Sequence, residues 1–417
     1  MHVLIRFSWF LILTLTLSAC KSSNSISGRN LSHLYRVDLE EEIEVDYELV
    51  HLGGGKSRLA FKIAADMLAS AQGETNFSIR YRLYQTYSSP DPIDSGYSIF
   101  AANVVSGREI HDHLDVDIPA GRNYMLDVSI TDLNAVKMNR QYIDVINPSH
   151  FSRQSFQLQT SLGERVFTSY VTQADSFELK LGSHVDKPIY ARFYDRNFPI
   201  AAPPFSATNN RPFEFRPDRV FELEIAGDER IGLPITRSGF YQVSNDTLKK
   251  MGGTVYYFGQ HFPAAKTLND LLLPLRYITT SPEYKAIVES ENKKQAIDEY
   301  WLGVGGSAER ARMLIKSYYS RVEEANTIFS SYMEGWKTDR GMCFIVFGPP
   351  SHVYRTTAQE TWLYGEQGKY NALRLVFTRV VNPFTANDFR LNRNATLKSP
   401  WYRAVEFWRQ GRVITYK

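Results

Sequence analysis

The sequence predicts a mixed fold, with two N-terminal all-β modules of the Ig-like sandwich type followed by a C-terminal α+β domain. Between residues 35 and 260, short runs alternate apolar and polar side chains, as strands with one buried face do. The 25 tyrosines and 25 phenylalanines favour sheets, whose faces need large side chains. After residue 280 the apolar spacing becomes three and four residues, which is typical of helices.

We expect a β-sandwich domain over residues 35–147 and a second β-rich domain over residues 150–260. The stretch between Pro199 and Pro217 carries five prolines, so it is predicted to be a loop. The clearest strand signals are Phe77–Leu83, Tyr124–Ile130, Phe177–Leu181, Ile189–Tyr194 and Val220–Ile225.

The C-terminal α+β domain is expected over residues 265–417. Pro282 suits the first turn of a helix that continues to about Tyr300, and Ser307 is a good N-cap for a longer amphipathic helix. Further predicted elements are strands at Met342–Phe347, Thr361–Tyr364 and Leu373–Val380, a helix at Trp401–Arg409 and a closing run at Val413–Tyr416.

Residues 1–19 have the order of a lipoprotein signal peptide. A polar start with Arg6 precedes an apolar run too short to cross a bilayer, and the small pair Ser18-Ala19 stands directly before Cys20. We therefore expect Cys20 to be acylated, and residues 20–34 to hold this cysteine and a polar tether. The alternative is an ordinary cleaved signal with a chance cysteine.

The composition limits the classes of binding partner that we expect. The net charge is only +3, which provides no basic field for nucleic acid, so no nucleic-acid partner is expected. Acylation of Cys20 would leave Cys343 without a disulfide partner. Cys343 lies in an apolar run, which favours a small buried side chain over a reactive thiol.

One motif resembles a known family. The residues are Gly335, Trp336, Thr338, Asp339, Arg340, Gly341, Gly348, Pro349 and Pro350. They resemble the signature of the GWxTD-domain proteins, which are exported bacterial proteins common in Bacteroidota. Blocks around Tyr300-Trp301, Glu360–Gly365 and Trp401–Arg409 extend the resemblance, although Gly303–Gly305 stands where many relatives have Arg-Asp-Pro. The resemblance implies an exported protein with sandwich-like N-terminal regions, and it names no reaction.

The motif has a structural and a catalytic interpretation. Structurally, Trp336 is a natural core residue between helix and sheet, while Thr338 and Asp339 can bind nearby backbone amides and fix a turn. Catalytically, Asp339 with Arg340 or His352 would form the polar site of a hydrolase or transferase that acts on envelope polymers. We favour the structural interpretation, because acid–base chemistry needs a positioned partner.

Other candidate sites are weaker. His111, His113, Asp115 and Asp117 share one face of a predicted strand, but side chains along one strand splay too widely for a compact metal site. A Cys343–His352 pair has nothing to orient the imidazole. Exposed tyrosines on a sandwich could bind glycans, and the candidates are Tyr81, Tyr84, Tyr87, Tyr190 and Tyr194. No catalytic, cofactor or metal residue is predicted.

These observations favour a lipoprotein that binds or scaffolds other proteins in a cell-envelope assembly. Its partners would be a membrane, through acylated Cys20, and envelope proteins. Lys21 follows the cysteine and no acidic residue precedes Asp38. Inner-membrane retention and surface export of known bacterial lipoproteins are associated with acidic residues soon after the cysteine, so this resemblance implies the periplasmic face of the outer membrane. The alternatives are an envelope-polymer enzyme with its site near Asp339, and a glycan-binding module.

Overall fold

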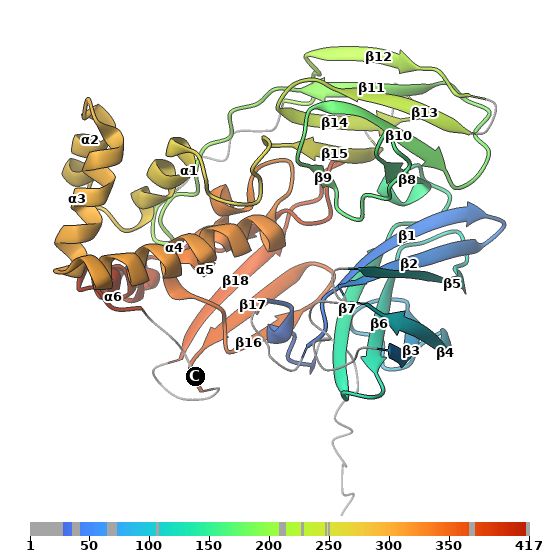
Figure 1. The fold of residues 1–417 in the computed structure, drawn as a ribbon, viewed down its shortest axis with the longest axis horizontal. Coiled ribbons are helices and arrows are strands. Elements are labelled where there is room, and N and C mark those ends of the chain that lie inside the picture. The colour runs from blue at the N-terminus through green and yellow to red at the C-terminus, as the bar shows by residue number, and fades with distance from the viewer. Residues whose placement is uncertain are drawn as a thin grey trace, which may run out of the picture.

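The computed structural model describes residues 28–35, 42–64, 73–105, 108–207, 214–226, 229–246, 248, 251–366 and 372–413. The predicted signal over residues 1–19, Cys20 and most of the closing run at 413–416 lie outside the described residues. Two β-rich regions lie on one side of the molecule, and the helices and a smaller sheet lie on the other (Figure 1). The mixed fold class predicted from the sequence is confirmed.

The first β-rich region consists of two sheets that share one core. The sheets have the strand orders β1-β2-β5 and β4-β3-β6-β7. The strands are β1 (Val45–Gly53), β2 (Lys56–Ala64), β3 (Gly73–Tyr84), β4 (Asp94–Val104), β5 (Glu109–Asp117), β6 (Tyr124–Asp132) and β7 (Lys137–Val145). Leu59 of the first sheet and Leu126 of the second are fully buried in the same cluster. The predicted alternating runs lie in β3 and β6.

The second β-rich region also has two sheets around one core. Their orders are β13-β10-β8 and β12-β11-β14-β15-β9. The elements are η4 (Arg153–Ser155), β8 (Phe156–Gln159), β9 (Tyr170–Val171), β10 (Asp175–Leu181), β11 (Ile189–Tyr194), β12 (Arg219–Leu223), β13 (Arg230–Ile235), β14 (Gly239–Ser244) and β15 (Gly253–Tyr257). Leu179 and Val243, one from each sheet, are fully buried in this core.

The C-terminal region packs helices against a four-stranded antiparallel sheet in the order β16-β17-β18-β19. The helices are α1 (Leu268–Leu272), η5 (Leu273–Tyr277), α2 (Ser281–Glu289), α3 (Lys293–Gly305), α4 (Ala308–Phe329), η6 (Gly335–Lys337), α5 (Asp339–Phe347), η7 (Ala395–Leu397) and α6 (Lys398–Arg409). The strands are β16 (His352–Arg355), β17 (Gln359–Tyr364), β18 (Leu373–Arg379) and β19 (Phe389–Leu391). Ser307 caps α4 as predicted, and its side chain accepts from the Arg310 N–H.

The strand predicted at Met342–Phe347 is wrong, because these residues form most of helix α5. A short apolar run has no periodicity that separates a buried strand from a helix buried on every side. All six residues of the run are at most 1% exposed, so the helix has no polar face to reveal its period. Thr338 begins the helix as its N-cap and Gly348 ends it.

The single helix predicted from Pro282 to about Tyr300 is two helices, α2 and α3. Ser290 ends α2 in an extended conformation. Asn292 then caps α3, where its side chain accepts from the Gln295 N–H. Asparagine favours such a cap because its side chain competes for backbone bonds inside a helix.

Residues 28–35, called here the N-terminal segment, pack between the first β-rich region and the C-terminal sheet. The Leu31 N–H donates to the Val353 carbonyl at 2.8 Å. The Asn30 side chain accepts from the Val353 N–H at 2.9 Å and donates to the Ser351 carbonyl at 3.2 Å. The segment therefore extends the edge of the C-terminal sheet beside β16.

Apolar burial completes this packing. Leu31 is fully buried, and Tyr35, which ends the short helix η2 (Ser32–Tyr35), packs its ring against Phe329 and Trp362. The tether expected over residues 20–34 is corrected at its end: residues 30–34 are packed structure, because the sheet edge and the core bind them. Residues 20–27 lie outside the described residues.

An aromatic cluster joins the second β-rich region to the C-terminal region. Its buried members are Tyr194, Phe240, Tyr256, Tyr332 and Phe384. The Tyr256 hydroxyl donates to the Phe384 carbonyl at 2.9 Å, and the Gln242 amide donates to the Pro383 carbonyl at 3.2 Å. The sheet containing β14 and β15 is thereby attached to the loop between β18 and β19.

None of the helices in the described ranges combines the length and apolar composition needed to cross a membrane.

Leu31→Ala should reduce the free energy of unfolding by about 3 kcal/mol, because it removes a fully buried side chain and leaves a cavity. Leu162→Ala is the matched control, since Leu162 is 85% exposed, and its effect should stay within about 0.5 kcal/mol. Urea unfolding measures both. Equal midpoints for the two variants would contradict the packed position of the N-terminal segment.

Candidate functional site

The motif identified in the sequence forms a tight backbone crossing at the end of α4. A Cβ atom placed on Gly335 would lie 1.8 Å from the Ala325 carbonyl oxygen of α4. A Cβ placed on Gly341 would lie 1.9 Å from the Gly335 carbonyl oxygen. Both contacts are with backbone that cannot move aside, so only glycine allows η6 and α5 to approach α4 this closely.

Trp336 is the core residue of this crossing. It is 5% exposed, its N–H donates to Asn326 Oδ1 at 3.1 Å, and its carbonyl accepts from the Tyr277 hydroxyl at 2.8 Å. The Lys337 ammonium lies 5.6 Å from the centroid of the indole ring and 2.8 Å from Glu334 Oε1. The motif tryptophan therefore connects α4, η5 and η6.

Thr338 and Asp339 bind the ends of two elements. Thr338 Oγ1 accepts from the Gly341 N–H at 3.0 Å and donates to the Gly335 carbonyl at 2.7 Å, which caps α5 and closes η6. Asp339 Oδ2 accepts from the Leu391 N–H at 2.8 Å and from Arg393 Nη1 at 2.9 Å. The aspartate thus ties the start of α5 to the end of β19.

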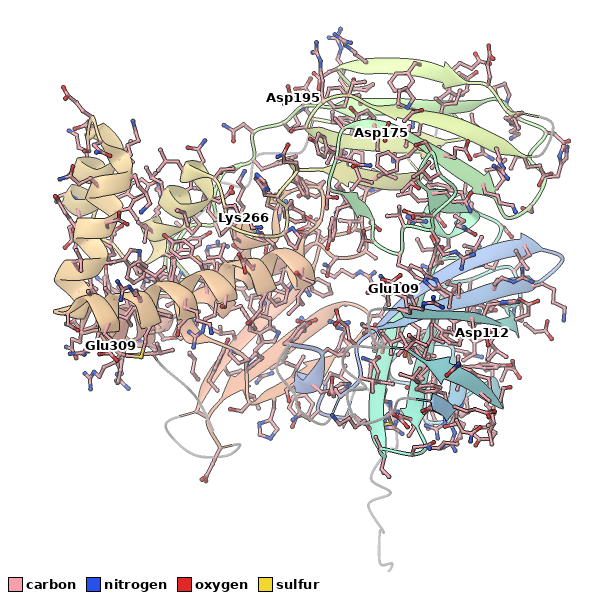
Figure 2. All side chains as sticks on the ribbon, in the orientation of Figure 1. Glu109, Asp112, Asp175, Asp195, Lys266 and Glu309 are labelled. Carbon is pink, nitrogen blue, oxygen red and sulfur yellow. The ribbon has the colours of Figure 1, made fainter. Side chains whose placement is uncertain are left out.

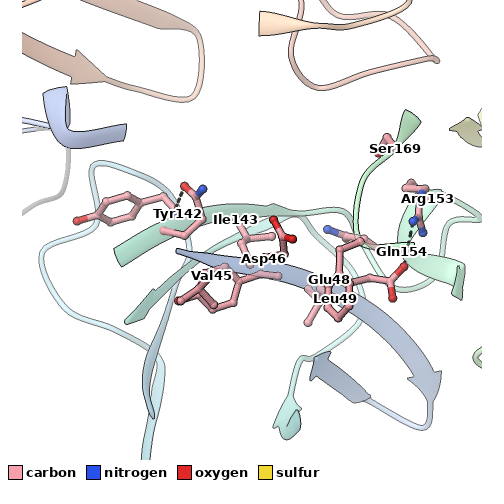
Figure 3. A pocket seen from close by; sticks show the side chains of 12 residues that line it. Val45, Asp46, Glu48, Leu49, Tyr142, Ile143, Arg153, Gln154 and Ser169 are labelled. Atoms are coloured by element: carbon pink, nitrogen blue, oxygen red, sulfur yellow. Dashed lines mark hydrogen bonds and ion pairs between the residues drawn. The ribbon is translucent and has the colours of Figure 1, made fainter. Parts of the chain in front are cut away.

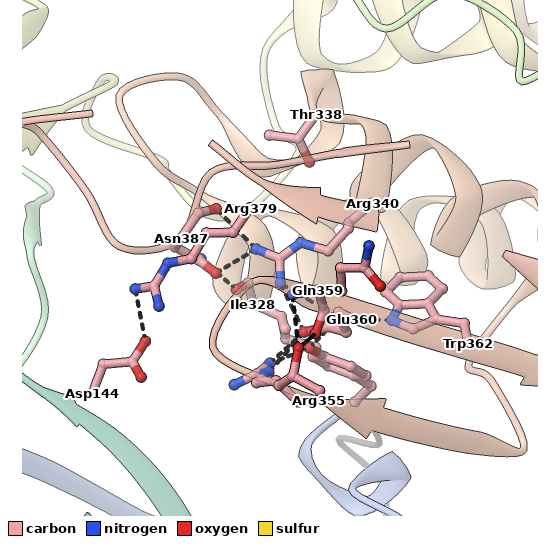
Figure 4. Close-up of polar contacts among 12 residues, drawn as sticks. Asp144, Ile328, Thr338, Arg340, Arg355, Gln359, Glu360, Trp362, Arg379 and Asn387 are labelled. Carbon is pink, nitrogen blue, oxygen red and sulfur yellow. Dashed lines mark hydrogen bonds and ion pairs between the residues drawn. The ribbon is translucent and has the colours of Figure 1, made fainter. Parts of the chain in front are cut away.

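Arg340 enters a buried charge cluster, shown in Figure 4. Arg340 Nη1 lies 3.4 Å from Glu360 Oε2 on β17, and Arg340 Nη2 donates to the Asn387 carbonyl at 2.9 Å. The side chains of Arg340 and Glu360 are 2% and 0% exposed. Phe329 and Phe389 contribute ring faces beside the guanidinium.

Glu360 is the centre of that cluster. Its Oε2 accepts from Arg355 Nε at 2.8 Å, and its Oε1 accepts from the Tyr35 hydroxyl and from Trp362 Nε1, both at 2.7 Å. Burial by itself raises the pKa of Glu360, but the charges of Arg355 and Arg340 outweigh it and lower the pKa to about 2. The carboxylate is therefore ionised and fully bonded at neutral pH.

The glycine that ends α5 lies against a second buried arginine. A Cβ on Gly348 would lie 2.8 Å from Arg321 Nη2, and the Gly348 carbonyl accepts from the Tyr364 hydroxyl at 3.0 Å. Arg321 donates to the Ile345 carbonyl at 3.2 Å and lies over the Trp408 ring. Burial lowers the pKa of Arg321 to about 10. Pro349 and Pro350 follow and direct the chain to β16.

The thiol–imidazole pair is not assembled. Cys343 is fully buried in the core, and burial raises the pKa of its thiol, which disfavours the thiolate needed for nucleophilic chemistry. His352 lies at the start of β16, where its ring stacks on Tyr354. Asp339 binds Arg393 and Arg340 binds Glu360, so the polar site proposed from Asp339, Arg340 and His352 is not formed either.

His111, His113, Asp115 and Asp117 share one exposed face of β5, the strand on which Glu109 and Asp112 are labelled in Figure 2. Asp115 pairs with Arg58 at 2.8 Å and Asp117 with Lys56 at 2.6 Å across the neighbouring strand. No group of three or more His, Cys, Asp or Glu side chains within the described ranges is arranged to hold a metal ion.

The five tyrosines considered as a glycan platform do not form one. Tyr81, Tyr84, Tyr87 and Tyr194 are each at most 9% exposed, and Tyr190 is half-buried. Their rings and hydroxyls contribute to cores instead: Tyr87, for example, donates to Asp144 at 3.1 Å. Stacking on a sugar requires an exposed ring face, which these buried residues lack.

Two cavities among the described residues bear on the site. One, of about 520 Å³, adjoins the motif and has Trp336, Lys337, Glu334 and His261 among its lining residues; Asp339 is not among them. The other, of about 420 Å³, lies where β1 and β7 meet the second β-rich region, and the Glu48–Arg153 ion pair at 2.9 Å borders it (Figure 3). Neither contains a nucleophile paired with a base.

Comparison with known proteins identifies the C-terminal region. The family model of the GWxTD domain matches residues 239–410, so this part of the chain is a GWxTD domain. The match begins earlier than the resemblance in the sequence suggested, at β14 of the second β-rich region. The aromatic cluster explains this start, because Phe240 and Tyr256 pack against Tyr332 and Phe384 of the C-terminal region.

Other comparisons add no function. No curated protein matches the chain in sequence. Its structure is similar to red sea bream transglutaminase over 53% of this chain and 31% of that one, at 7% identity and a TM-score of 0.20. It is also similar to the BSP domain of a biofilm-associated protein over 55% of this chain and 54% of that one, at 7% identity and a TM-score of 0.16. TM-scores this low support no conclusion about the fold or function of this chain.

Sequence reasoning missed the partners of the motif. Glu360, Asn387 and Arg393 bind Arg340 and Asp339 from 20 to 54 residues away along the chain. Tyr35 binds Glu360 from a distance of 325 residues. The one available signal was that Glu360 shares a strand face with Trp362 and Tyr364, since a charge at a buried strand position needs a partner.

Gly335→Ala should lower the free energy of unfolding by at least about 3 kcal/mol, because the new methyl group overlaps the Ala325 carbonyl. Gly303→Ala is the matched control: no atom lies within 4 Å of its added Cβ, and Gly303 lies inside α3. That control should raise stability by up to about 1 kcal/mol. Thermal and urea unfolding measure the change in stability of both variants, and equal changes would contradict the close backbone approach at Gly335.

The buried cluster should make stability sensitive to acid. The folded-state pKa of Glu360 is about 2, against an ordinary value of 4.5. A lowered pKa contributes stability that is complete above pH 4.5 and is lost as pH falls towards 2, by about 3 kcal/mol. Unfolding free energy measured from pH 7 to 2 should show this loss, and Glu360→Gln should remove that component of it.

Glu283→Gln serves as the control for this titration. Arg409 lowers the pKa of Glu283 to about 2 as well, but the Glu283 side chain is 38% exposed. Solvent and salt screen that pair, so its acid-dependent loss should be smaller and should shrink further at high salt. Superimposable pH profiles for wild type and Glu360→Gln would contradict the buried cluster.

Proposed function

We propose that this protein is a lipid-anchored envelope protein, held at the periplasmic face of the outer membrane, that binds or scaffolds other envelope proteins without catalysing a reaction. Its anchor would be the acylated Cys20. Its working parts would be the surfaces of the two β-rich regions and the GWxTD domain, whose polar motif residues serve the fold.

The observation that supports a non-catalytic role is the use of the motif's polar groups. Asp339 accepts from the Leu391 N–H and pairs with Arg393, and its side chain is 9% exposed. Arg340 is 2% exposed and pairs with Glu360. A general acid or base must exchange protons with a substrate, and groups committed to internal bonds are poorly placed for that.

The connection between anchor and fold supports a scaffold. Residues 30–35 contact the C-terminal sheet through backbone bonds and bind Glu360 through Tyr35. Arg379 of β18 also pairs with Asp144 of β7 at 3.0 Å, which joins the C-terminal region to the first β-rich region. An anchor attached at this junction would hold several modules in one orientation at a surface.

Lipidation and assembly can be tested together. An alkyne-tagged fatty acid should label the wild-type chain and the Cys343→Ala variant, and should leave Cys20→Ser unlabelled, because Cys343 is buried and Cys20 is the acceptor. Affinity purification of the labelled chain from mildly solubilised envelope should then recover protein partners in fixed ratio. An unlabelled wild-type chain would contradict the anchor, and recovery of the monomer alone would contradict the scaffold.

A further inference from the structure

One face of the sheet β4-β3-β6-β7 is covered at one end and open at the other. The covered end carries Tyr84, Met125 and Tyr142, which join the same core as the N-terminal segment and the GWxTD domain. The rest of this face extends along the strands towards the turn between β6 and β7. That turn lies at the lower edge of the molecule in Figure 1, away from the second β-rich region.

The open end carries exposed apolar side chains among polar ones. The strand pairings place Ile99, Ser78, Thr131 and Met138 in one row across the four strands, and Tyr97, Arg80, Ser129 and Arg140 in the next row. The exposed apolar side chains are Tyr97 (54%), Ile99 (55%), Leu133 (43%), Val136 (82%) and Met138 (45%). We call these five residues the apolar patch. Clustered exposure of this kind marks an interaction surface more often than single exposed residues do.

Val136 is unfavourable for the isolated fold in two ways. Its side chain is 82% exposed, and its backbone φ is 58°. A β-branched residue is strained in this left-handed region, where glycine and asparagine are favoured. Its apolar side chain at the turn is therefore explained better by contact with an apolar partner than by local stability.

The position of the N-terminal segment indicates the partner. His33 lies against Tyr142 of β7, with ring centroids 6.2 Å apart, on the same sheet face as the patch. Val136 precedes Tyr142 by six residues, about 20 Å along a strand. Residues 20–27 span at most about 28 Å when fully extended, so an acyl group on Cys20 would hold a bilayer within reach of the turn.

We propose that the apolar patch rests on the lipid surface to which Cys20 is anchored. This inference depends on the lipid anchor of the proposed function. Residues 21–27 (KSSNSIS) have one large apolar side chain, Ile26, so they match the patch poorly as an alternative cover. Leu133 and Val136 would enter the boundary between headgroups and acyl chains.

Charge and aromatic chemistry fit the same partner. The Arg80 guanidinium lies 5.6 Å from the centroid of the Tyr97 ring, and Arg80 is exposed beside the patch. Arginine at this position can bind lipid phosphates, while tyrosine favours the interface between water and hydrocarbon. The contact can be weak, because the anchor already holds the protein at the surface and makes docking intramolecular.

The test uses the full lipidated chain in vesicles of phosphatidylethanolamine and phosphatidylglycerol. An environment-sensitive fluorophore is attached at Ala135→Cys in the turn, and at Val381→Cys as the control. Val381 is 94% exposed and follows β18, whose Arg379 binds the opposite end of β7. Cys343 is buried and Cys20 acylated, so the introduced thiol is the one expected to react.

We expect a blue shift and quenching by lipid-phase quenchers at residue 135, and neither at residue 381. Adding Val136→Asn to the Ala135→Cys chain should reduce the quenching at least twofold and raise Tm, because asparagine accepts the positive φ but loses the apolar contact. A variant that failed to fold would lower Tm, so the opposite signs separate contact from stability.

Each outcome has one meaning. A chain without acyl label that does not bind vesicles contradicts the proposed function itself. An acyl-labelled, vesicle-bound chain with equal solvent exposure at residues 135 and 381 overturns the membrane contact but agrees with the lipid anchor. Shielding of residue 135 in native envelope but not in protein-free vesicles also overturns it, in favour of a protein partner.

Discussion

The arrangement of the C-terminal region depends on the ion pairs and hydrogen bonds of the buried Glu360 carboxylate. An ionised group without exposure is tolerated only when charges and donors surround it. Arg340 from α5, Arg355 from β16 and Tyr35 from the N-terminal segment supply them. These elements are far apart in sequence, so the carboxylate is satisfied only when helix, sheet and N-terminal segment are assembled together.

The GWxTD motif supplies the part of this arrangement whose residues are close together in the sequence. Gly335 and Gly341 allow three stretches of backbone to approach within contact distance, and Thr338 begins the helix that carries Arg340 inward. Asp339 fixes the same helix to β19. A polar motif of this kind resembles an active site in sequence, yet here its charges are matched within the protein. The features that remain for interaction are surfaces and cavities.

The same assembly would fix the position of the proposed lipid anchor relative to the fold. The N-terminal segment lies between the first β-rich region and the GWxTD domain, and Arg379 and Asp144 pair beside it. Lipidation at Cys20 would transmit the orientation of the membrane to both regions over a few residues. The apolar patch occupies the open part of the sheet face that this segment partly covers, which gives the proposed anchor and the proposed membrane contact a common location.

The sequence by itself determined the fold class and many elements. Alternation marked β3 and β6, and Ser307 with its apolar spacing marked α4, because these signals reside in one segment. It also indicated the GWxTD family. Tertiary structure alone decided that residues 342–347 are helical, because a run buried on all sides shows no period. It also decided the partners of Asp339 and Arg340 and the burial of Leu31 and Tyr35. Those depend on contacts between residues up to 325 positions apart, which no local pattern encodes.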